Sequence, residues 1–417
     1  MLNRPPSVDA LARSGHHTGL PHPLLVDVAR DVIEAGHHEE FAVRVGELRR
    51  SMLQRVINAT GVLLHTNLGR APFAHTTEAC YSNLELDLET GRRGSRSDHV
   101  GRLLARACGA EAGLVVNNGA GAVLLALAGL ARGRGVAVSR GELVEIGGGF
   151  RIPDVIAQSG AQLVEVGTTN RTRVEDYAAV QGHVAVTLRV HRSNFRITGF
   201  TEQATTGEVA ALETPLVVDL GSGLVDAACQ WLDGGSPVWL ADEPGVRQTL
   251  AAGASLVTFS GDKLFGGPQA GIIVGNAHLV AACARDPLYR ALRPGQLILS
   301  ALHEVALRYL DRTAGELPFW RMATAPIERL RARAAALDVG RVVDCDSVPG
   351  GGTLPGVTIA SAGIELEGDH TAALRAAASR RVIARVHDGR TVLDLRTVDP
   401  TDDPAVADAV RDVVSDA

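Results

Sequence analysis

The residue with the clearest potential for covalent chemistry is Lys263. The 417-residue sequence contains 41 lysine and arginine residues, of which 40 are arginine and one is lysine. An arginine guanidinium stays protonated and cannot form an imine, whereas a lysine amine can act as a nucleophile and a base. A composition that uses arginine wherever a positive charge suffices keeps lysine where its amine is needed. The alternative interpretation is a chance remnant of arginine-rich coding.

The residues around Lys263 suit a ligand that carries both an aldehyde and a phosphate. An apolar run, 255–259, predicts a strand that delivers Ser260, and Gly266 and Gly267 let the chain turn back after the lysine. A hydroxyl three residues before the lysine can bind the phosphate while the amine condenses with the aldehyde. The segment therefore predicts pyridoxal 5'-phosphate as the cofactor, with Lys263 as its Schiff-base lysine and Ser260 as a phosphate ligand.

A carboxylate, Asp219, ends a second apolar run, 216–220, and lies 44 residues before Lys263. At the carboxyl end of a strand it could pair with the pyridinium nitrogen of the cofactor and keep that nitrogen protonated. A strand-ending aspartate that caps the next helix is about as common an arrangement. In combination with the lysine segment, we predict that Asp219 binds the cofactor.

A small-residue turn provides a candidate site for the cofactor phosphate. Asn118, Gly119 and Ala120 follow a strand-like run and precede a helix-compatible run. Free N–H groups and the positive end of the helix dipole favour phosphate at such a terminus. A bare glycine turn is a weak signal, and this one lacks the pattern of a nucleotide P-loop.

Three arginines could hold an oxyanion. Arg70 follows a strand-like run, and Arg290 and Arg293 are three residues apart, which places them on one face if that segment is helical. Clustered guanidinium groups bind phosphate and similar anions. Solvated surface arginines are the more common outcome for such pairs.

The order of the predicted elements indicates an α/β protein. Apolar strands alternate with helix-compatible stretches such as 122–131, 153–158 and 174–180, which predicts a mostly parallel sheet covered on both faces. The strands that we expect span 113–117, 135–139, 162–166, 184–190, 216–220, 255–259 and 271–274. A long helix, 296–311, then leads to a mixed segment with a helix at 326–336, strand-like runs at 357–360, 382–386 and 391–395, and a final helix after Asp403.

Three domains are expected from this pattern. Residues 1–55 read as a small helical domain, 56–315 as the large catalytic domain and 316–417 as a small C-terminal α/β domain. The first 55 residues hold seven arginines and seven acidic residues, and the whole chain has a formal charge of −6, so charge alone predicts no nucleic-acid partner. We expect a soluble, cytoplasmic protein with no membrane segment.

The cysteines predict neither a metal site nor a disulfide framework. All five are scattered without a C-x-x-C pair, and free, mostly buried thiols are the expectation. They are Cys80, Cys108, Cys229, Cys283 and Cys345.

Together, these motifs resemble bacterial selenocysteine synthase, the L-seryl-tRNA(Sec) selenium transferase family. The resemblance is specific and covers about residues 55 to 400. The matching stretches are 56–61, 65–70, 139–147, 150–155, 165–170, 193–197, 260–271, 287–293, 351–356, 388–390 and 395–398.

The resemblance implies a fold-type I, aminotransferase-like architecture in which Lys263 binds pyridoxal 5'-phosphate. It also implies a catalytic role for Asp262, oxyanion binding by Arg70, Arg290 and Arg293, and homo-oligomeric rings of dimers, with a decamer expected and active sites between subunits. The small N-terminal domain of the family binds tRNA, and residues 1–55 occupy its place.

This chain departs from the family pattern in three places. Its phosphate turn reads Asn-Asn-Gly-Ala-Gly-Ala at 117–122 instead of Asn-Asn-Asn-Ala-Ala-Ala, and residues 294–296 read Pro-Gly-Gln where an acidic residue and a lysine are common. The first 55 residues show no concentration of basic side chains, so tRNA binding rests on the resemblance alone.

The implied reaction removes the serine hydroxyl of seryl-tRNA(Sec) by β-elimination and adds selenium from selenophosphate to the same carbon. The freed Lys263 amine would take the α-proton, and Asp262 is the nearest candidate for the proton donor. Two alternatives remain open: a lyase that acts on a small phosphorylated amino-acid or amino-sugar acid, and an inactive tRNA-binding scaffold.

Overall fold

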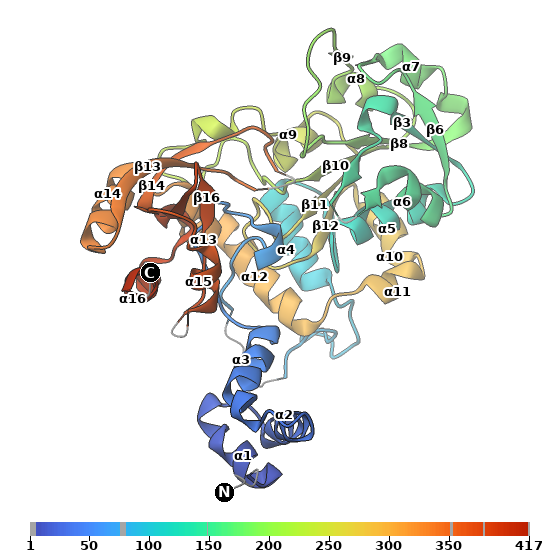
Figure 1. The fold of residues 1–417 in the computed structure, drawn as a ribbon. Helices are drawn as coiled ribbons and strands as arrows, with labels where there is room; N and C mark the ends of the chain where they lie inside the picture. The colour runs from blue at the N-terminus through green and yellow to red at the C-terminus, as the bar shows by residue number, and fades with distance from the viewer. Residues whose placement is uncertain (1–5, 76–80, 148, 351–352, 378–379, 416–417) are drawn as a thin grey trace, which may run out of the picture. The chain divides into compact units, whose positions relative to one another are not determined.

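The chain folds into two compact units, Met1–Val56 and Ile57–Ala417, each with its own hydrophobic core. The structure is a computed structural model that describes residues 6–75, 81–147, 149–350, 353–377 and 380–415 (Figure 1). Among these residues, no helix is long and apolar enough to cross a membrane.

The first unit consists of three helices, α1 (Val8–Ser14), α2 (His22–Glu34) and α3 (Phe41–Ser51). Their apolar faces meet in a small core that includes Leu25 and Val32 of α2. The last helix, α3, ends at Ser51, and the backbone is extended at Met52.

The second unit is built on a seven-stranded sheet in the order β2-β12-β11-β10-β8-β3-β6. Its strands are β2 (Ala112–Val116), β3 (Gly135–Ser139), β6 (Gln162–Val166), β8 (Val184–Val190), β10 (Leu216–Gly221), β11 (Leu256–Ser260) and β12 (Gly271–Gly275). Five neighbouring strands, from β11 to β6, are parallel, and β12 is antiparallel to both of its neighbours. The prediction of a mostly parallel α/β sheet is confirmed.

Helices cover both faces of this sheet, which explains why its strands are apolar on both sides. Along β12, Ile272 and Val274 point into one core and Ile273 into the other, as the period of two requires. One face packs against α4 (Asp98–Cys108), α8 (Thr206–Ala210), α9 (Val246–Ala251) and α12 (Gln296–Leu310). The other packs against α5 (Gly119–Ala131), α6 (Ile152–Gln158), α10 (Ala277–Arg285) and α11 (Leu288–Leu292).

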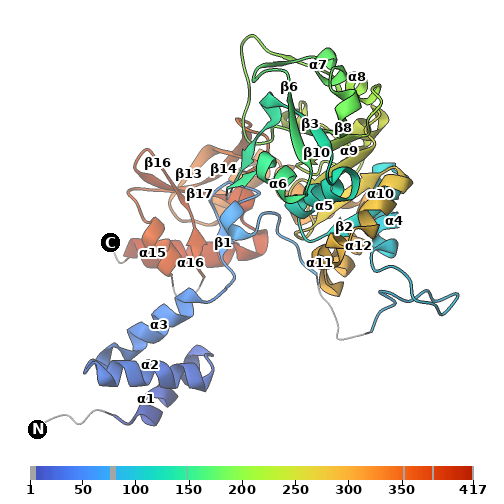
Figure 2. The ribbon, with the colours of Figure 1, turned by 90° about the vertical axis from the view of Figure 1, so that its right-hand side faces the viewer.

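The C-terminal part forms a second sheet, antiparallel and four-stranded, in the order β13-β14-β17-β16. Figure 2 shows these strands with α15 and α16, apart from β3, β6 and β8. The elements are β13 (Arg341–Ser347), β14 (Ile359–Leu366), β16 (Arg385–His387), β17 (Arg390–Asp394), α13 (Pro318–Ala323), α14 (Ile327–Ala336), α15 (Thr371–Ala376) and α16 (Asp403–Ser415). Sequence patterns missed β13, which is mostly exposed and carries three charged residues.

Short pairings complete the second unit. β1 (Ile57–Asn58) pairs with β15 (Val382–Ile383), β4 (Glu145–Ile146) with β5 (Phe150–Arg151), and β7 (Arg171–Thr172) with β9 (Glu202–Gln203). The remaining helix is α7 (Val174–Ala178). Of the cysteines, Cys108, Cys229 and Cys283 are free and buried, Cys345 is free and partly buried, and Cys80 lies outside the described residues.

Helix α4 lies close against β2, the strand that leads into the predicted phosphate turn. A side chain at Gly101 of α4 would overlap the carbonyl oxygen of Gly113 in β2, and one at Gly113 would collide with the Gly101 carbonyl. Both positions are therefore restricted to glycine by the approach of two backbones. Helix α4 also packs against α12.

We predict that Gly101→Ala lowers the free energy of unfolding by about 1 to 3 kcal/mol, because the added methyl group forces α4 away from β2. Gly207 in α8 is the matched control, since its nearest neighbour would be 3.8 Å from an added Cβ. There, alanine should be neutral or stabilise by up to about 1 kcal/mol. Urea denaturation measures both, and equal effects at the two sites would contradict the close packing.

Candidate active site

Lys263 lies in a tight turn between β11 and β12. The turn is closed by the N–H of Gly261, which donates to the Ala270 carbonyl at 2.9 Å, and by the N–H of Gly267, which donates to Gly261 at 2.8 Å. Gly266 has a φ of 72°, the left-handed conformation that favours glycine. The strand, polar turn and return strand predicted from the sequence are all present.

The Lys263 side chain is buried, with an exposed fraction of 5%. Burial lowers the pKa of its amine, and the nearby Arg70 guanidinium lowers it further, while Asp219, Asp262 and Glu243 act in the opposite direction. A lowered pKa means that the neutral, nucleophilic amine is present at a lower pH than in an exposed lysine. The site is therefore suited to a reaction between this amine and an aldehyde.

Asp219 lies on β10 directly beside β11, where it pairs in register with Thr258. It is 6% exposed, and its Oδ1 accepts a hydrogen bond from the Thr258 hydroxyl at 2.8 Å. Burial raises the pKa of this carboxyl, and the Thr258 hydrogen bond and the Lys263 charge oppose that rise. A buried carboxylate in this setting is stabilised by a cationic N–H partner such as a pyridinium.

The backbone after Asp219 brings its strand end to Lys263. The register with β11 shifts between Asp219 and Gly221, and Gly221 has a φ of 65°. A Cβ at Gly221 would lie 3.7 Å from the Lys263 Nζ. The N–H of Leu264 also donates to the Ser222 carbonyl at 2.9 Å, so the two segments are joined by hydrogen bonding.

The predicted phosphate turn lies against Ser260. Asn118 caps α5 by accepting a hydrogen bond from the Gly121 N–H at 2.8 Å, so its side chain shapes the turn. A Cβ at Gly119 would lie 2.6 Å from the Ser260 Oγ, which shows how near the two are. Within the described residues, the N–H groups of Gly119 and Ala120 donate to no protein acceptor. Together with the helix dipole, they form an anion site beside a hydroxyl.

These residues fit pyridoxal 5'-phosphate. Three kinds of group come together where the strands of the sheet end. They are the amine for its aldehyde, the carboxylate for its ring nitrogen, and the hydroxyl and helix N-terminus for its phosphate. A further group fits as well: the Ser222 Oγ is fully buried and has no hydrogen-bond partner among the described residues. Sequence reasoning missed Ser222, although it directly follows the Asp219 strand. No cluster of metal-ligating side chains occurs in the part of the chain that the structure describes.

The three candidate anion-binding arginines fall into two groups. The Arg70 Nη1 lies 3.8 Å from the Asp262 Oδ1, and the N–H of Ala71 donates to the Asp262 carbonyl at 3.1 Å. Arg290, in α11, and Arg293, at its end, line a separate cavity of about 380 Å³. Among the described residues, no hydrogen bond or ion pair joins Arg70 to the other two.

The cavity of Arg290 and Arg293 is strongly basic. It is also lined by Arg93, Arg96 and Arg285, and by two acidic residues, Asp286 and Glu85, of which Glu85 contacts three of the guanidinium groups. Hydrogen bonds from Arg96 and Arg93 lower the pKa of Glu85 to about 2. The Leu292 carbonyl accepts a hydrogen bond from the Asn117 N–H at 3.0 Å, which connects the segment before Arg293 to the phosphate turn.

Sequence reasoning also missed the pair formed by the partly exposed His191 and the buried Glu243. The His191 Nε2 lies 3.3 Å from the Glu243 Oε2, and the His191 N–H donates to the Asp219 carbonyl at 2.8 Å. His191 directly follows a predicted strand, the same signal that identified Asp219. Glu243 lies in a segment without a predicted element, so nothing in the sequence pointed to it. Residues 351 and 352 of the family-like motifs lie outside the described residues.

Comparison with known proteins identifies close relatives along nearly the whole chain. Residues 56–399 match the family model described as L-seryl-tRNA selenium transferase. The L-seryl-tRNA(Sec) selenium transferase of Geobacter sulfurreducens is 45% identical, covering 90% of this chain and 87% of that protein. The enzyme of the same name from Hyphomonas neptunium is 44% identical, covering 96% of this chain and 89% of that protein.

A solved structure supports the fold. The chain superposes on D-glucosaminate-6-phosphate ammonia-lyase with a TM-score of 0.60 at 20% identity, covering 88% of this chain and 97% of that one. At this level of identity the likeness concerns the fold alone.

We predict that pyridoxal 5'-phosphate followed by borohydride reduction labels Lys263, and that the labelling is half-maximal at a pH below about 10.4, the value for an exposed lysine. The reason is that burial and Arg70 lower the pKa of this amine, so its neutral form persists at lower pH. Peptide mapping by mass spectrometry gives the labelled fraction at each pH.

The same chain unfolded in urea is the control, because it exposes the same amine. Labelling confined to the α-amino group, or a folded-state midpoint equal to that of the unfolded chain, would contradict the buried and activated amine.

Proposed function

This chain belongs to the L-seryl-tRNA selenium transferase family, and we propose that Lys263, Asp219 and Asp262 carry out its reaction. The protein is a pyridoxal 5'-phosphate-dependent enzyme that converts seryl-tRNA(Sec) to selenocysteinyl-tRNA(Sec). The observation that carries the assignment of residues is the burial of the Lys263 amine at the sheet edge that also holds Asp219 and Ser260.

Lys263 has two tasks in this proposal. Its Nζ would hold the cofactor, and with seryl-tRNA in the site its free amine would take the α-proton of the serine. The lowered pKa suits the second task, because at a given pH more of the amine is neutral and able to accept a proton than in an exposed lysine. When bound, the cofactor supplies a conjugated ring that accepts the electron pair left on the α-carbon.

Asp219 would hold a proton on the ring nitrogen. Its carboxylate is fixed by the Thr258 hydroxyl and shielded from water, so a cationic N–H next to it interacts in a medium of low polarity. Ser260, together with Asn118, Gly119 and Ala120, would hold the phosphate and thereby orient the ring.

Asp262 is our candidate for the proton donor to the departing serine hydroxyl. It directly precedes Lys263, is 8% exposed and contacts Arg70. Loss of the hydroxyl breaks the Cβ–O bond and requires one proton for the leaving water, and Asp262 is the nearest acidic group on the same turn.

Selenophosphate is the proposed selenium donor, held by Arg70, Arg290 and Arg293. Guanidinium groups bind phosphate oxygens through pairs of charge-assisted hydrogen bonds. In one chain, Arg70 and the other two arginines belong to different clusters. We therefore infer that a neighbouring subunit contributes one of the groups, in a homo-oligomeric ring of dimers for which we propose a decamer.

The N-terminal unit is the proposed tRNA-binding domain. Its support is its position, since it precedes a catalytic unit of this family and has a helical core of its own. With seven arginines against seven acidic residues in 1–55, it would recognise tRNA by shape and local contacts. We propose that the enzyme acts in the cytoplasm, where aminoacyl-tRNAs are used.

The alternative functions are less well supported. A small-molecule lyase shares the fold, but that likeness is at 20% identity, whereas the transferase relatives reach 45%. An inactive tRNA-binding scaffold would not need a buried lysine and carboxylate at one sheet edge.

We predict that the purified protein, loaded with pyridoxal 5'-phosphate and supplied with selenophosphate, converts seryl-tRNA(Sec) but leaves an ordinary seryl-tRNA unchanged. Lys263→Ala and Lys263→Arg should abolish turnover and the absorbance of the bound cofactor, because neither side chain forms an imine. Chromatography of the released amino acids measures the product. Turnover by Lys263→Ala at the normal rate would contradict the assignment.

We also predict that replacing either Arg290 or Arg293 by alanine weakens the use of selenophosphate by about 1.5 to 3 kcal/mol, or roughly 10- to 150-fold in kcat/KM for this donor. Arg308→Ala is the control, since Arg308 pairs with Glu316 on the surface of α12. Steady-state kinetics with varied selenophosphate provide the measurement. An Arg290→Ala, Arg293→Ala double variant with normal kinetics would place the donor site elsewhere.

A further inference from the structure

Glu243 is a buried carboxylate that is only half satisfied. Its side chain is 3% exposed, and its Oε2 pairs with His191 at 3.3 Å. Its Oε1 is also buried, and it accepts no hydrogen bond among the described residues. A buried carboxylate oxygen without a donor is costly, so such an atom points to a ligand that supplies an N–H or O–H group.

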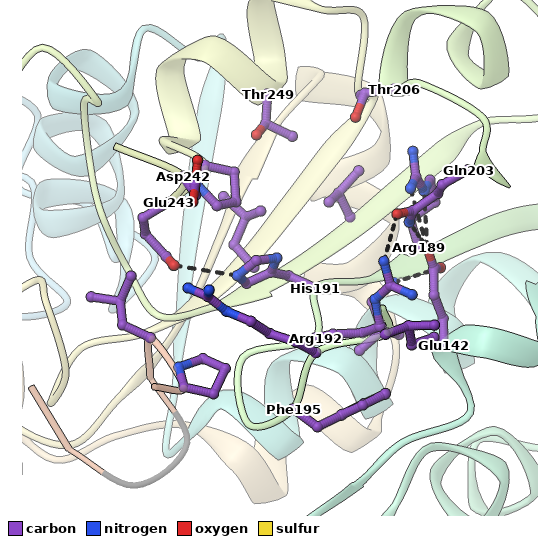
Figure 3. A pocket seen from close by; sticks show the side chains of 18 of the residues that line it. Glu142, Arg189, His191, Arg192, Phe195, Gln203, Thr206, Asp242, Glu243 and Thr249 are labelled. Atoms are coloured by element: carbon purple, nitrogen blue, oxygen red, sulfur yellow. Dashed lines mark hydrogen bonds and ion pairs between the residues drawn. The ribbon is translucent and has the colours of Figure 1, made fainter. Parts of the chain in front are cut away.

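Glu243 lines a cavity of about 470 Å³, a size that is typical of small-ligand sites. Figure 3 shows His191 and Glu243 joined across this pocket. Three guanidinium groups, those of Arg189, Arg192 and Arg196, also line it. The lining thus combines a buried acceptor and several cations with two further carboxylates, Glu142 and Asp242.

The cavity has the chemistry to bind a nucleotide. Arg196 forms no ion pair or hydrogen bond with the described residues, so its guanidinium can contact a phosphate. Phe195, 37% exposed, offers a ring on which a base can stack. Arg189, in contrast, is already held by the buried Glu142 at 3.2 Å and helps to shape the wall.

The cavity borders the catalytic residues. His191 follows β8, and its N–H donates to the carbonyl of Asp219 on the neighbouring strand at 2.8 Å. Val218 and Leu220, the residues on either side of Asp219, line the cavity as well, and their side chains point to the opposite face of β10 from that of Asp219. The Glu243 charge also acts on the Lys263 amine. A molecule in the cavity would therefore lie beside the end of β10, the strand that carries Asp219, and within reach of the charge interaction between Glu243 and Lys263.

The substrate places a ribose close to the reacting serine. In seryl-tRNA, the carboxyl group of serine is esterified to a hydroxyl oxygen of the terminal ribose. This ribose therefore lies only a few bonds from the reacting α-carbon. The hydroxyl next to the ester oxygen is a hydrogen-bond donor. Of the hydrogen-bond donors in the tRNA itself, this hydroxyl lies nearest to the reacting carbon. A buried carboxylate could accept a hydrogen bond from it.

We propose that this cavity binds the 3'-terminal nucleotide of seryl-tRNA, with the free 2'-hydroxyl of its ribose donating to the Glu243 Oε1. The inference rests on the proposed function, because it assumes that serine reacts at Lys263. Phe195 then stacks on the terminal base, and Arg196 contacts a phosphate. His191 holds the Glu243 carboxylate in place and so acts as a positioning residue.

The test is a double-mutant cycle between the protein and the tRNA. Glu243→Gln is combined with a seryl-tRNA(Sec) whose terminal ribose lacks the 2'-hydroxyl and carries serine on the 3'-oxygen. In the wild-type enzyme, removal of the hydroxyl should raise the KM for seryl-tRNA by about tenfold or more, because a charge-assisted hydrogen bond is lost. In Glu243→Gln, the same removal should change the KM by less than about twofold.

Controls separate this inference from the proposed function. Glu316→Gln, a surface substitution, should respond to the missing hydroxyl as the wild type does. Thermal unfolding of Glu243→Gln, compared with that of the wild type, shows whether the variant is folded. An equal KM of the wild-type enzyme for the two tRNAs, or an equal response of wild type and Glu243→Gln, overturns the inference. Failure of the wild-type enzyme to convert normal seryl-tRNA(Sec) overturns the proposed function instead.

Discussion

The structure depends on one constraint: an amine has to be kept out of water and still be available for reaction at the edge of a parallel sheet. Burial of Lys263 lowers the pKa of its amine, and the carboxylates nearby limit how far it falls. That balance requires Asp219 and Asp262 to stay near the amine. The sheet provides this, because β10 and β11 end side by side and their hydrogen-bonded register fixes both turns.

Much of this arrangement could be predicted from the sequence, because it follows from local patterns. The sequences of β8, β10 and β11 are continuous apolar runs, so the ends of these strands could be predicted. Asp219 and Ser260 were identified because they lie at the ends of two of these runs. The Lys263 turn could also be found from the sequence, because Lys263 is the single lysine among the 41 lysine and arginine residues. The resemblance to a known family then supplied the substrate, which no periodicity could give.

Other parts depend on contacts between distant residues and could not be predicted in this way. Glu243 meets His191 across 52 residues of sequence, and Glu85 meets Arg293 only because two loops converge. β13 was missed because a mostly exposed strand with alternating charges lacks the apolar signal. The separation of Arg70 from Arg290 and Arg293 is likewise a property of the fold, and it bears on how subunits would share the site.

The most direct test of this account is an experimental structure of the protein loaded with pyridoxal 5'-phosphate. The account predicts a covalent bond from the Lys263 Nζ to the cofactor, its ring nitrogen within hydrogen-bond distance of Asp219, and its phosphate at Ser260 and the start of α5. A cofactor bound elsewhere, or an Asp219 carboxylate far from the ring nitrogen, would contradict it.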